Sequence, residues 1–293
     1  MTAIDTSTVP APASGNRLVR FCRFARRNPT MLIGAAILIF FVGIAIIAPL
    51  IAGDPMLKLP TRRLQPPSPA LRFGTDQLGQ DVFARTVYGA RVSLIVGLSV
   101  ATISILIGLT IGLFAGYYRR FDAIVMRLMD GLMAIPAILL AIAMVSLNQG
   151  SIGIVIAAIS IPELPRVVRL VRSIVLSVKE LPFVEAARAC GAKTPRILFR
   201  HIMPSTIAPL IVQATYICAS AILVEASLSF LGAGVPPEVP SWGNMIASSR
   251  LYLARAPWTI FCPAIALALV VLAVNLLGDG LRDRLDPRLS RRL

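Results

Sequence analysis

The stretch EAARACGAKTPRILFRHIMP, from Glu185 to Pro204, is a polar and basic insert in an otherwise apolar chain. Its first residues favour helix, and Gly191 supplies the permissive backbone that ends a short helix. Thr194 followed by Pro195 is typical of a helix N-cap with proline at the first helical position. The stretch therefore predicts a helix, a bend and a second helix, a shape suited to docking against another protein.

The composition of the whole chain is that of an integral membrane protein. The 293 residues have a mean hydropathy of +0.79, and 56% are hydrophobic against 15% charged, which is too apolar for a soluble globule. Apolar stretches of about 20 residues can cross a bilayer as helices. The predicted spans are 31–51, 92–118, two helices within 125–172 joined near 148–153, then 205–224 and 256–278. The sequence therefore predicts an all-α fold with six transmembrane helices.

The net charge of +15 comes largely from basic residues at the predicted membrane edges. Most of them fall in segments that are cytoplasmic if both termini are inside, which is the positive-inside pattern. The chain then divides into a basic cytoplasmic tail at 1–30, the first span at 31–51, an extracytoplasmic segment at 52–91, a five-helix core at 92–278 that contains a cytoplasmic loop at 183–204, and a cytoplasmic tail at 279–293. A nucleic-acid-binding protein would gather its cations among aromatic residues on one surface. The expected partner is therefore the lipid bilayer and not nucleic acid.

The chain offers no pattern for a metal, nucleotide or catalytic site. His201 is the only histidine, and the cysteines lack the CxxC spacing of a zinc site. Gly74 and Gly79 have the glycine spacing of a phosphate-binding loop, but Gln80 and Asp81 stand where Lys and Ser or Thr should be. We therefore expect no catalytic residue and no bound cofactor, so the energy for any transport must come from elsewhere.

The second span is predicted to pack closely against a neighbouring helix. Gly108, Gly112 and Gly116 recur at four-residue intervals and leave one helix face without side chains, which permits close contact in lipid. Before this span, a helix from Asp81 onward is expected to lie in the membrane interface, with Arg85 facing water.

The fourth span carries charge and two prolines at its predicted end. Pro162 and Pro165 should distort or terminate the helix there, because proline lacks an amide donor. Glu163 could touch a transported substrate, but a pairing with Arg166 or Arg169 is the favoured interpretation.

The fifth span is the most polar. Gln213, Tyr216, Ser220 and Glu225 are candidates for a hydrated translocation path, because polar side chains in lipid need partners or water. Hydrogen bonds to neighbouring helices explain the same residues without a transport role, and both interpretations stay open. In the loop that follows, Trp242 is predicted to anchor at the membrane interface.

The insert resembles the EAA loop of bacterial ABC importer permeases. The residues that match its spacing or lie in its closing stretch are Glu185, Ala186, Ala187, Gly191, His201 and Pro204. Three further blocks, FGTDQLGQDVFARTVYGARVSL, EASLSFLGAGVPPEVPSWGNM and VLAVNLLGDGLRDRLDPRL, resemble one branch of this family in sequence and order. That branch is the second membrane subunit of the dipeptide, oligopeptide and nickel import systems. The resemblance covers almost everything from Arg17 onward.

The resemblance implies a type I ABC importer permease (MetI-like) fold in the bacterial inner membrane, with both termini cytoplasmic. It also implies a heterodimer with a second permease subunit, two cytoplasmic ABC ATPase subunits that use ATP and Mg, and an extracytoplasmic substrate-binding protein. In the family the EAA loop is the coupling helix, seated in a groove on an ATPase subunit. Coupling to the ATPase is therefore expected of the six residues just named.

Several functions remain open within and outside this family. Di- or oligopeptides are the expected substrates, with nickel chelates, glutathione or another small solute as alternatives. A secondary carrier would use ion-coupling residues deep in the spans and often inverted repeats, and no convincing repeat is seen. A membrane enzyme would need a catalytic dyad or metal ligands within the spans. A scaffold or sensor would form a complex without substrate-stimulated ATP hydrolysis.

Overall fold

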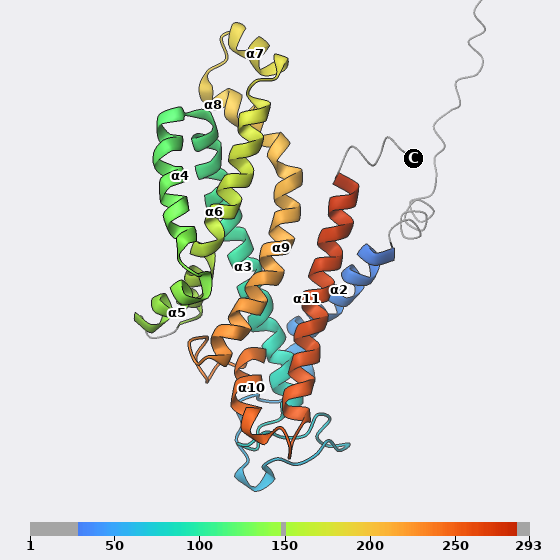
Figure 1. Cartoon of the computed structure of the whole chain (residues 1–293). Helices are drawn as coiled ribbons and strands as arrows, with labels where there is room; N and C mark the ends of the chain where they lie inside the picture. The colour runs from blue at the N-terminus through green and yellow to red at the C-terminus, as the bar shows by residue number, and fades with distance from the viewer. Residues whose placement is uncertain (1–28, 148–150, 286–293) are drawn as a thin grey trace, which may run out of the picture.

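The computed structural model describes residues 29–147 and 151–285, and every element in these ranges is helical (Figure 1). The long helices are α2 (Pro29–Ile51), α3 (Val82–Tyr117), α4 (Arg119–Ala134), α5 (Ala137–Leu147), α6 (Ile152–Val178), α9 (Met203–Phe230) and α11 (Trp258–Leu285). The short elements are η1 (Pro60–Arg62), α7 (Pro182–Ala189), α8 (Thr194–Arg196), the π turn η2 (Ile197–Ile202), α10 (Trp242–Ser249) and η3 (Arg250–Tyr252). The predicted N-terminal tail up to residue 28, the joint at 148–150 and the tail from 286 onward lie outside the described residues.

The all-α membrane architecture is confirmed by the length and composition of the helices. Within the described ranges, four helices are long and apolar enough to cross a membrane: Pro29–Ile51, Val82–Tyr117, Thr194–Phe230 and Trp258–Leu285. Helices α4 and α5 are bent by 87° at a short break and add a fifth if they form one span. Helix α6 is not one of these four because it carries four charged residues, Glu163, Arg166, Arg169 and Arg172. The count of six and the sides of the two termini therefore stay predictions.

The second long helix begins earlier than predicted. Asp81 caps α3, its side chain accepting a hydrogen bond from the Phe83 amide at 2.8 Å, so the expected interfacial helix is continuous with the span. The prediction that Arg85 faces water is wrong. Its Nη1 donates to Asp76 at 2.5 Å and to Gln80 at 2.7 Å, and the guanidinium is buried because this carboxylate accompanies it into the interior.

Helix α6 runs without interruption through Pro162 and Pro165, so of the two predicted outcomes, distortion or termination, termination is wrong. Prolines free backbone carbonyls, but neighbouring helices and Ser or Thr hydroxyls can bond them in a membrane bundle. Pro165 leaves the carbonyl of Ile161 without its helical donor. Beside it, the Ser104 hydroxyl of α3 donates to the carbonyl of Ser160, 3.4 Å away. The kink-prone part of α6 is therefore held by packing against α3.

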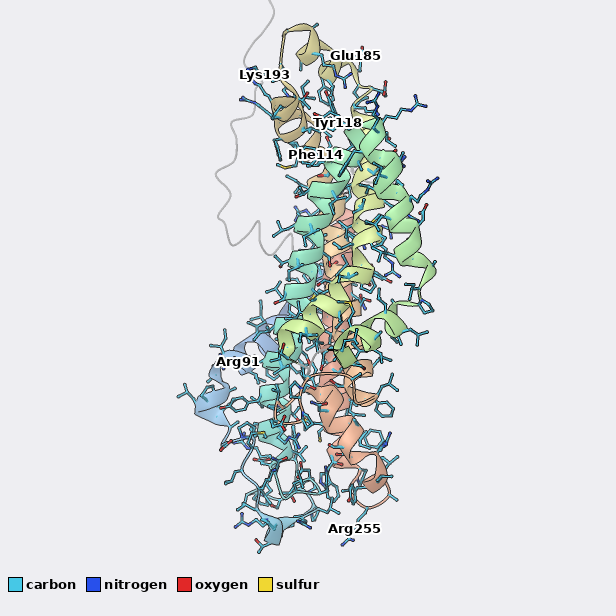
Figure 2. All side chains as sticks on the ribbon, turned by 90° about the vertical axis from the view of Figure 1, so that its left-hand side faces the viewer. Arg91, Phe114, Tyr118, Glu185, Lys193 and Arg255 are labelled. Atoms are coloured by element: carbon cyan, nitrogen blue, oxygen red, sulfur yellow. The ribbon has the colours of Figure 1, made fainter. Side chains whose placement is uncertain are left out.

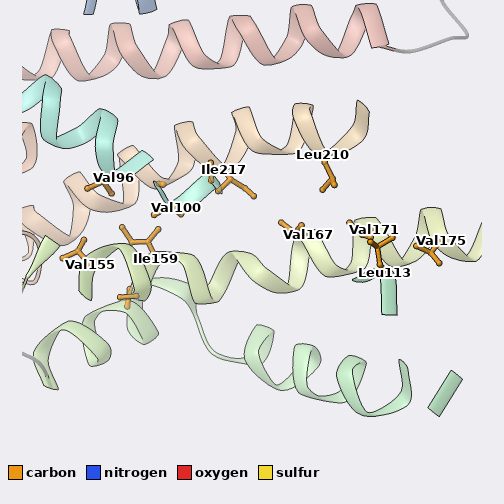
Figure 3. Close-up of a cluster of buried hydrophobic side chains, with 14 of the residues drawn as sticks. Val96, Val100, Leu113, Val155, Ile159, Val167, Val171, Val175, Leu210 and Ile217 are labelled. Carbon is orange, nitrogen blue, oxygen red and sulfur yellow. The ribbon is translucent and has the colours of Figure 1, made fainter. Parts of the chain in front are cut away.

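The centre of the bundle is a seam between α3 and α6 (Figure 3). A Cβ atom placed on the glycines of α3 would overlap valines of α6, and the pairs are Gly108 with Val167, Gly112 with Val171 and Gly116 with Val175. The predicted close packing is confirmed. Leu210 and Ile217 of α9 belong to the same buried cluster, so three helices share one core.

At the end of the bundle opposite α7, α10 and residues 52–81 cover the ends of α3 and α11 (Figure 1). Trp242 is fully buried, and its Nε1 donates to the carbonyl of Thr86 at 2.9 Å. The prediction of an interfacial Trp242 is wrong because the ring fills a space left by Gly89 and packs against Phe41. It joins α10 to α3 and α2.

Candidate functional site

The EAA segment forms a compact helical knob beyond the ends of the long helices. In Figure 2, Glu185 and Lys193 lie at one end of the molecule and Arg255 lies at the opposite end. We call residues 182–202 the coupling loop; it consists of α7, α8 and η2. Proline starts α7 at its first turn, where the missing amide costs no hydrogen bond. The predicted helix, bend and helix are therefore present.

Gly191 makes the bend between the two helices. Its φ of +78° is left-handed, and a Cβ on it would meet nothing within 4 Å, so backbone conformation alone favours glycine. The amide of Gly191 donates to the Arg188 carbonyl at 2.9 Å, and the amide of Ala192 donates to the Ala187 carbonyl at 3.0 Å. This pair of bonds is the Schellman ending of a helix. It fixes the direction in which the chain leaves α7.

The second half of the coupling loop joins α9 through a π turn. The N-cap of α8 is Lys193 and not Thr194 as predicted, and no side chain caps the helix. Pro204 lies in the first turn of α9, and the preceding amide, that of Met203, bonds the carbonyl of Leu198 five residues earlier. Proline cannot donate to the carbonyl four residues before it, and a π turn widens the helix at that point. Pro204 thus follows continuous helix and does not start an isolated span.

An apolar cluster anchors the coupling loop to the bundle. Val184 of α7 is fully buried, and it belongs to the same cluster as Ile197, Leu198 and Ile202 of η2. The cluster continues into the core between α3, α6 and α9. Burying one such side chain stabilises by about 1.5–3 kcal/mol relative to its exposure. The knob is therefore packed onto the spans and does not hang from a loose linker.

Polar contacts tie the same end of the bundle together. The guanidinium of Arg188 lies over the ring of Tyr117 at the end of α3, and Lys179 donates to the carbonyl of Gly116 at 3.2 Å. The fork of Arg172 on α6 donates to both carboxylate oxygens of Asp122 on α4, and the bond from its Nη2 is 2.7 Å long. These contacts link α7, α6 and α4 to one another and to α3, so a force on the knob reaches several helices.

The outward face of the coupling loop carries most of the residues expected to couple. Glu185 and Ala186 of α7 are exposed, and Ala187 is partly buried. His201 lies across the loop in η2, where its Nδ1 is 3.3 Å from the carbonyl of Arg196. Between α7 and η2 is a small hollow, lined by Ala187, Cys190, Gly191, Ala192, Arg196, Arg200 and His201. The structure therefore gathers five of the six expected residues around α7 and this hollow, with Pro204 beyond them at the start of α9.

The polar residues of the fifth span differ in how far they are exposed. Tyr216 is half exposed, whereas Gln213 and Ser220 are partly buried. Glu225 is completely buried, and its Oε1 accepts a hydrogen bond from Ser229 at 2.8 Å. Gln213 lies in a separate hollow between α9 and α11. We did not predict from the sequence that Arg166 of α6 lies against Tyr216. The signal was present in the arginines that recur every third residue of α6.

A bundle of apolar helices with a packed helical knob at one end has the build of a membrane transport permease. The sequence model of the family described as "Binding-protein-dependent transport system inner membrane component" matches residues 108–291. A second model, for the N-terminal transmembrane domain of oligopeptide transport permease C, matches residues 18–67. The chain belongs to the family of binding-protein-dependent transport system inner membrane components.

Relatives of similar length support this membership. A probable peptide ABC transporter permease protein of Sinorhizobium fredii is 62% identical over 92% of this chain and 93% of the relative. A dipeptide transport system permease protein of Alkalihalophilus pseudofirmus is 46% identical over 90% of this chain and 88% of its own length. A glutathione transport system permease protein of Pectobacterium atrosepticum is 44% identical over 76% of this chain and 75% of its own length.

The fold is also found among solved structures, of which we describe one. It is a chain of the MetNI methionine ABC transporter in an inward-facing conformation, matched with a TM-score of 0.54 over 70% of this chain and 97% of that chain. At 20% identity the likeness concerns the fold alone. The expected MetI-like permease fold is therefore confirmed.

Proposed function

We propose that this chain is one of two different permease subunits of an ATP-driven peptide importer in the inner membrane of a bacterium. Its partners would be a second permease, two cytoplasmic ABC ATPases and an extracytoplasmic binding protein that delivers the peptide. ATP and Mg would be bound by the ATPases and not by this chain. The relatives named for peptide and dipeptide transport, 62% and 46% identical, support di- or oligopeptides as the substrate.

The observation that carries the mechanism is the anchoring of the coupling loop. A knob that projects from the bundle, yet packs on it through Val184 and through Arg188 on Tyr117, can transmit the closure of an ATPase pair to the spans. Closure changes the equilibrium between two arrangements of the bundle only if the ATPase contacts differ in the two states. In this proposal those contacts are made by the exposed face of α7.

Each coupling residue has a stated part in this proposal. Glu185 would contact or orient the docking surface of the ATPase. Ala186 and Ala187 keep α7 slim enough to enter a groove, since their side chains add little beyond the backbone. Gly191 turns the chain away, and the hollow beside it, which His201 helps to line, would receive part of the ATPase. Pro204 sets the π turn through which movement of the knob passes into α9.

The test is uptake by the complete transporter in proteoliposomes. The chain is purified with its partner permease and ATPases, and a labelled dipeptide is supplied on the binding protein. We expect uptake that requires ATP on the cytoplasmic side of the transporter and that continues when the proton gradient is abolished. Uptake that follows the proton gradient without ATP would contradict the proposal and favour a secondary carrier.

Glutathione is the second candidate substrate, because one relative over three quarters of the chain is named for its transport. The two substrates share a peptide backbone and a free carboxylate, so the fold alone does not separate them. Competition decides between them. Excess glutathione should leave dipeptide uptake unchanged if peptides are the substrate, and unlabelled dipeptide should abolish it. Identification of the ligand that co-purifies with the binding protein gives an independent answer.

A further inference from the structure

Two kinds of exposed face distinguish the helices of the bundle. The outward residues of α2 and α11 include Ile39, Phe40, Phe261 and Ile265, all apolar and suited to lipid. Helix α6 differs in its second half, where all the exposed residues are polar. They are Arg166, Arg169, Ser173 and Ser177. This polar stripe needs a surrounding other than hydrocarbon.

Arg166 lies near the middle of the bundle, well inside its two ends. Its neighbour Val167 packs against Gly108 of α3, in the centre of the apolar stretch 92–117 of that helix. On the other side Arg166 approaches Tyr216, halfway along α9. An arginine at that depth is energetically costly if it faces lipid. The face it occupies therefore borders water or another subunit.

The side chains around Arg166 present its charge to that space. Its Nη1 donates to both carboxylate oxygens of Glu163 at 3.2 Å, and its guanidinium carbon lies 5.7 Å from the centroid of the Tyr216 ring. The Glu163 side chain is only 10% exposed, whereas that of Arg166 is 49% exposed. The carboxylate thus lies behind the guanidinium, and the ring attracts the cation from the α9 side.

One edge of the guanidinium is left for a ligand. Arginine has five N–H donors in a fixed fork, and within residues 29–147 and 151–285 Glu163 engages only Nη1. The edge formed by Nε and Nη2 remains, and this edge fits a carboxylate through two parallel bonds. A site of this shape selects a planar anion over a neutral or cationic group.

We propose that Arg166 binds the carboxylate of the transported substrate as it passes through the permease. This inference rests on the proposed function of peptide import and names the group that the path recognises. Peptides differ in their side chains, but each carries a terminal carboxylate. A path that passes many peptides can therefore hold this common group and ignore the rest.

Glu163 is a positioning residue in this proposal and also weakens the site. A lone guanidinium in a narrow, poorly hydrated path would bind a carboxylate strongly and release it slowly. Glu163 already neutralises part of that charge, so the substrate meets a weaker attraction. Transport requires binding that is favourable enough for entry and weak enough for exit.

The test compares one peptide with and without its carboxylate. Trialanine and trialanine amide are each supplied on the binding protein, at saturating concentration, to the complete transporter in proteoliposomes. In Arg166→Gln, uptake of trialanine should fall by about tenfold relative to uptake of the amide, the size expected for a charge-assisted pair. Equal changes for both peptides would overturn the proposal, because a purely structural role would affect them alike.

Arg169→Gln is the matched control. Arg169 lies one turn away on the same polar stripe, is 45% exposed and also pairs with a carboxylate, that of Asp130. Its replacement should leave the ratio of acid to amide uptake unchanged. Arg166→Lys should restore part of the ratio, since the charge remains but the second bond is lost. A ratio that moves equally in Arg169→Gln would also count against a site at Arg166.

Glu163→Gln separates positioning from general damage. With its competitor neutralised, Arg166 should hold trialanine more tightly, so the KM and the kcat for trialanine uptake should both fall while those for the amide stay constant. A rise in KM for both peptides would contradict the assigned part of Glu163.

Two other outcomes are distinguishable. If the wild-type transporter imports neither peptide but takes up another solute, the proposed function fails with it, and the carboxylate site is rejected at the same step. If wild type imports trialanine, but Arg166→Gln releases the partner permease during purification and both peptides fail together, Arg166 is an interface residue and only the further inference is overturned.

Discussion

Arg188 of α7 lies over the aromatic ring of Tyr117 at the end of α3, 5.6 Å from its centroid. The coupling loop is joined in sequence to α6 and α9, and this contact adds a connection to α3. Arg188→Ala should therefore reduce the peptide imported per ATP hydrolysed by about two- to fivefold, the value of an exposed cation–π contact. Uptake and ATP hydrolysis measured on the same proteoliposomes give this ratio.

Tyr117 supplies the matched variants for that prediction. Tyr117→Phe keeps the ring and should leave the ratio unchanged, whereas Tyr117→Ala should match Arg188→Ala. The double variant should be no worse than either single variant, because both remove one contact. Losses that add would show that the two residues act separately.

Gly191 is the second point at which coupling can be broken. Its φ of +78° is unfavourable for a β-branched residue, by about 1–2 kcal/mol. Gly191→Val should relieve this strain by changing the angle between α7 and α8, so uptake should be abolished while membrane insertion stays normal. Uptake assays and the amount of chain in the membrane fraction measure the two effects.

Gly43→Val is the control for adding a valine to a glycine site. Gly43 lies on α2, has no positive φ, and a Cβ there would meet nothing within 4 Å, as at Gly191. We expect normal uptake from this variant. Normal uptake by Gly191→Val would show that transport does not depend on the direction in which the chain leaves α7.

These sites also show which features the sequence could predict. Gly191 and its helix ending depend on residues within one turn of each other, and the glycine seam of α3 depends on a repeat within one helix. Both were predicted. Local chemistry and helical period specify such features without knowledge of the rest of the fold.

Two of the errors concern partners that lie outside the residue's own helix. Trp242 bonds a carbonyl 156 positions away, and Arg85 is buried because Asp76 lies in a preceding loop. The translocation path along the polar residues of α9 stays a prediction. Gln213, Tyr216 and Glu225 are all polar residues of one helix, and only the packing of α3 and α6 decides which of them is enclosed.

The seam between α3 and α6 predicts a stability effect. A valine at Gly112 would overlap Val171, so Gly112→Val should destabilise the bundle by about 1–3 kcal/mol, the usual cost of overpacking. Thermal unfolding of the purified chain in detergent, followed by loss of helix, should show a lower midpoint.

A second substitution tests whether that loss comes from the seam. Val171→Ala removes the Cγ1 methyl group, 3.0 Å from an added Cβ, but keeps the Val171 Cβ at 2.7 Å, so the double variant should recover only a small part of the lost stability. A double variant less stable than Gly112→Val would show that the overlap is not the cause.

The buried pair of Asp76 and Arg85 predicts the largest stability effect. Asp76 accepts hydrogen bonds from the amides of Leu78 and Gln80 at 2.8 Å in addition to its ion pair with Arg85. Asp76→Ala leaves the guanidinium buried without its countercharge, and removing one partner of a buried pair costs about 3–5 kcal/mol. The unfolding midpoint should fall further than in Gly112→Val.

The reason for this loss can be isolated by removing the second charge. Arg85→Met in the Asp76→Ala background replaces the stranded cation by an apolar chain of similar length, so stability should return in large part, since a buried pair contributes little net stability. Asp54→Ala is the control, because Asp54 is exposed and its carboxylate accepts a single hydrogen bond within the described part of the chain, from the amide of Met56. If Arg85→Met failed to restore the midpoint, the loop of residues 76–80 would depend on the carboxylate's amide bonds and not on the charge behind it.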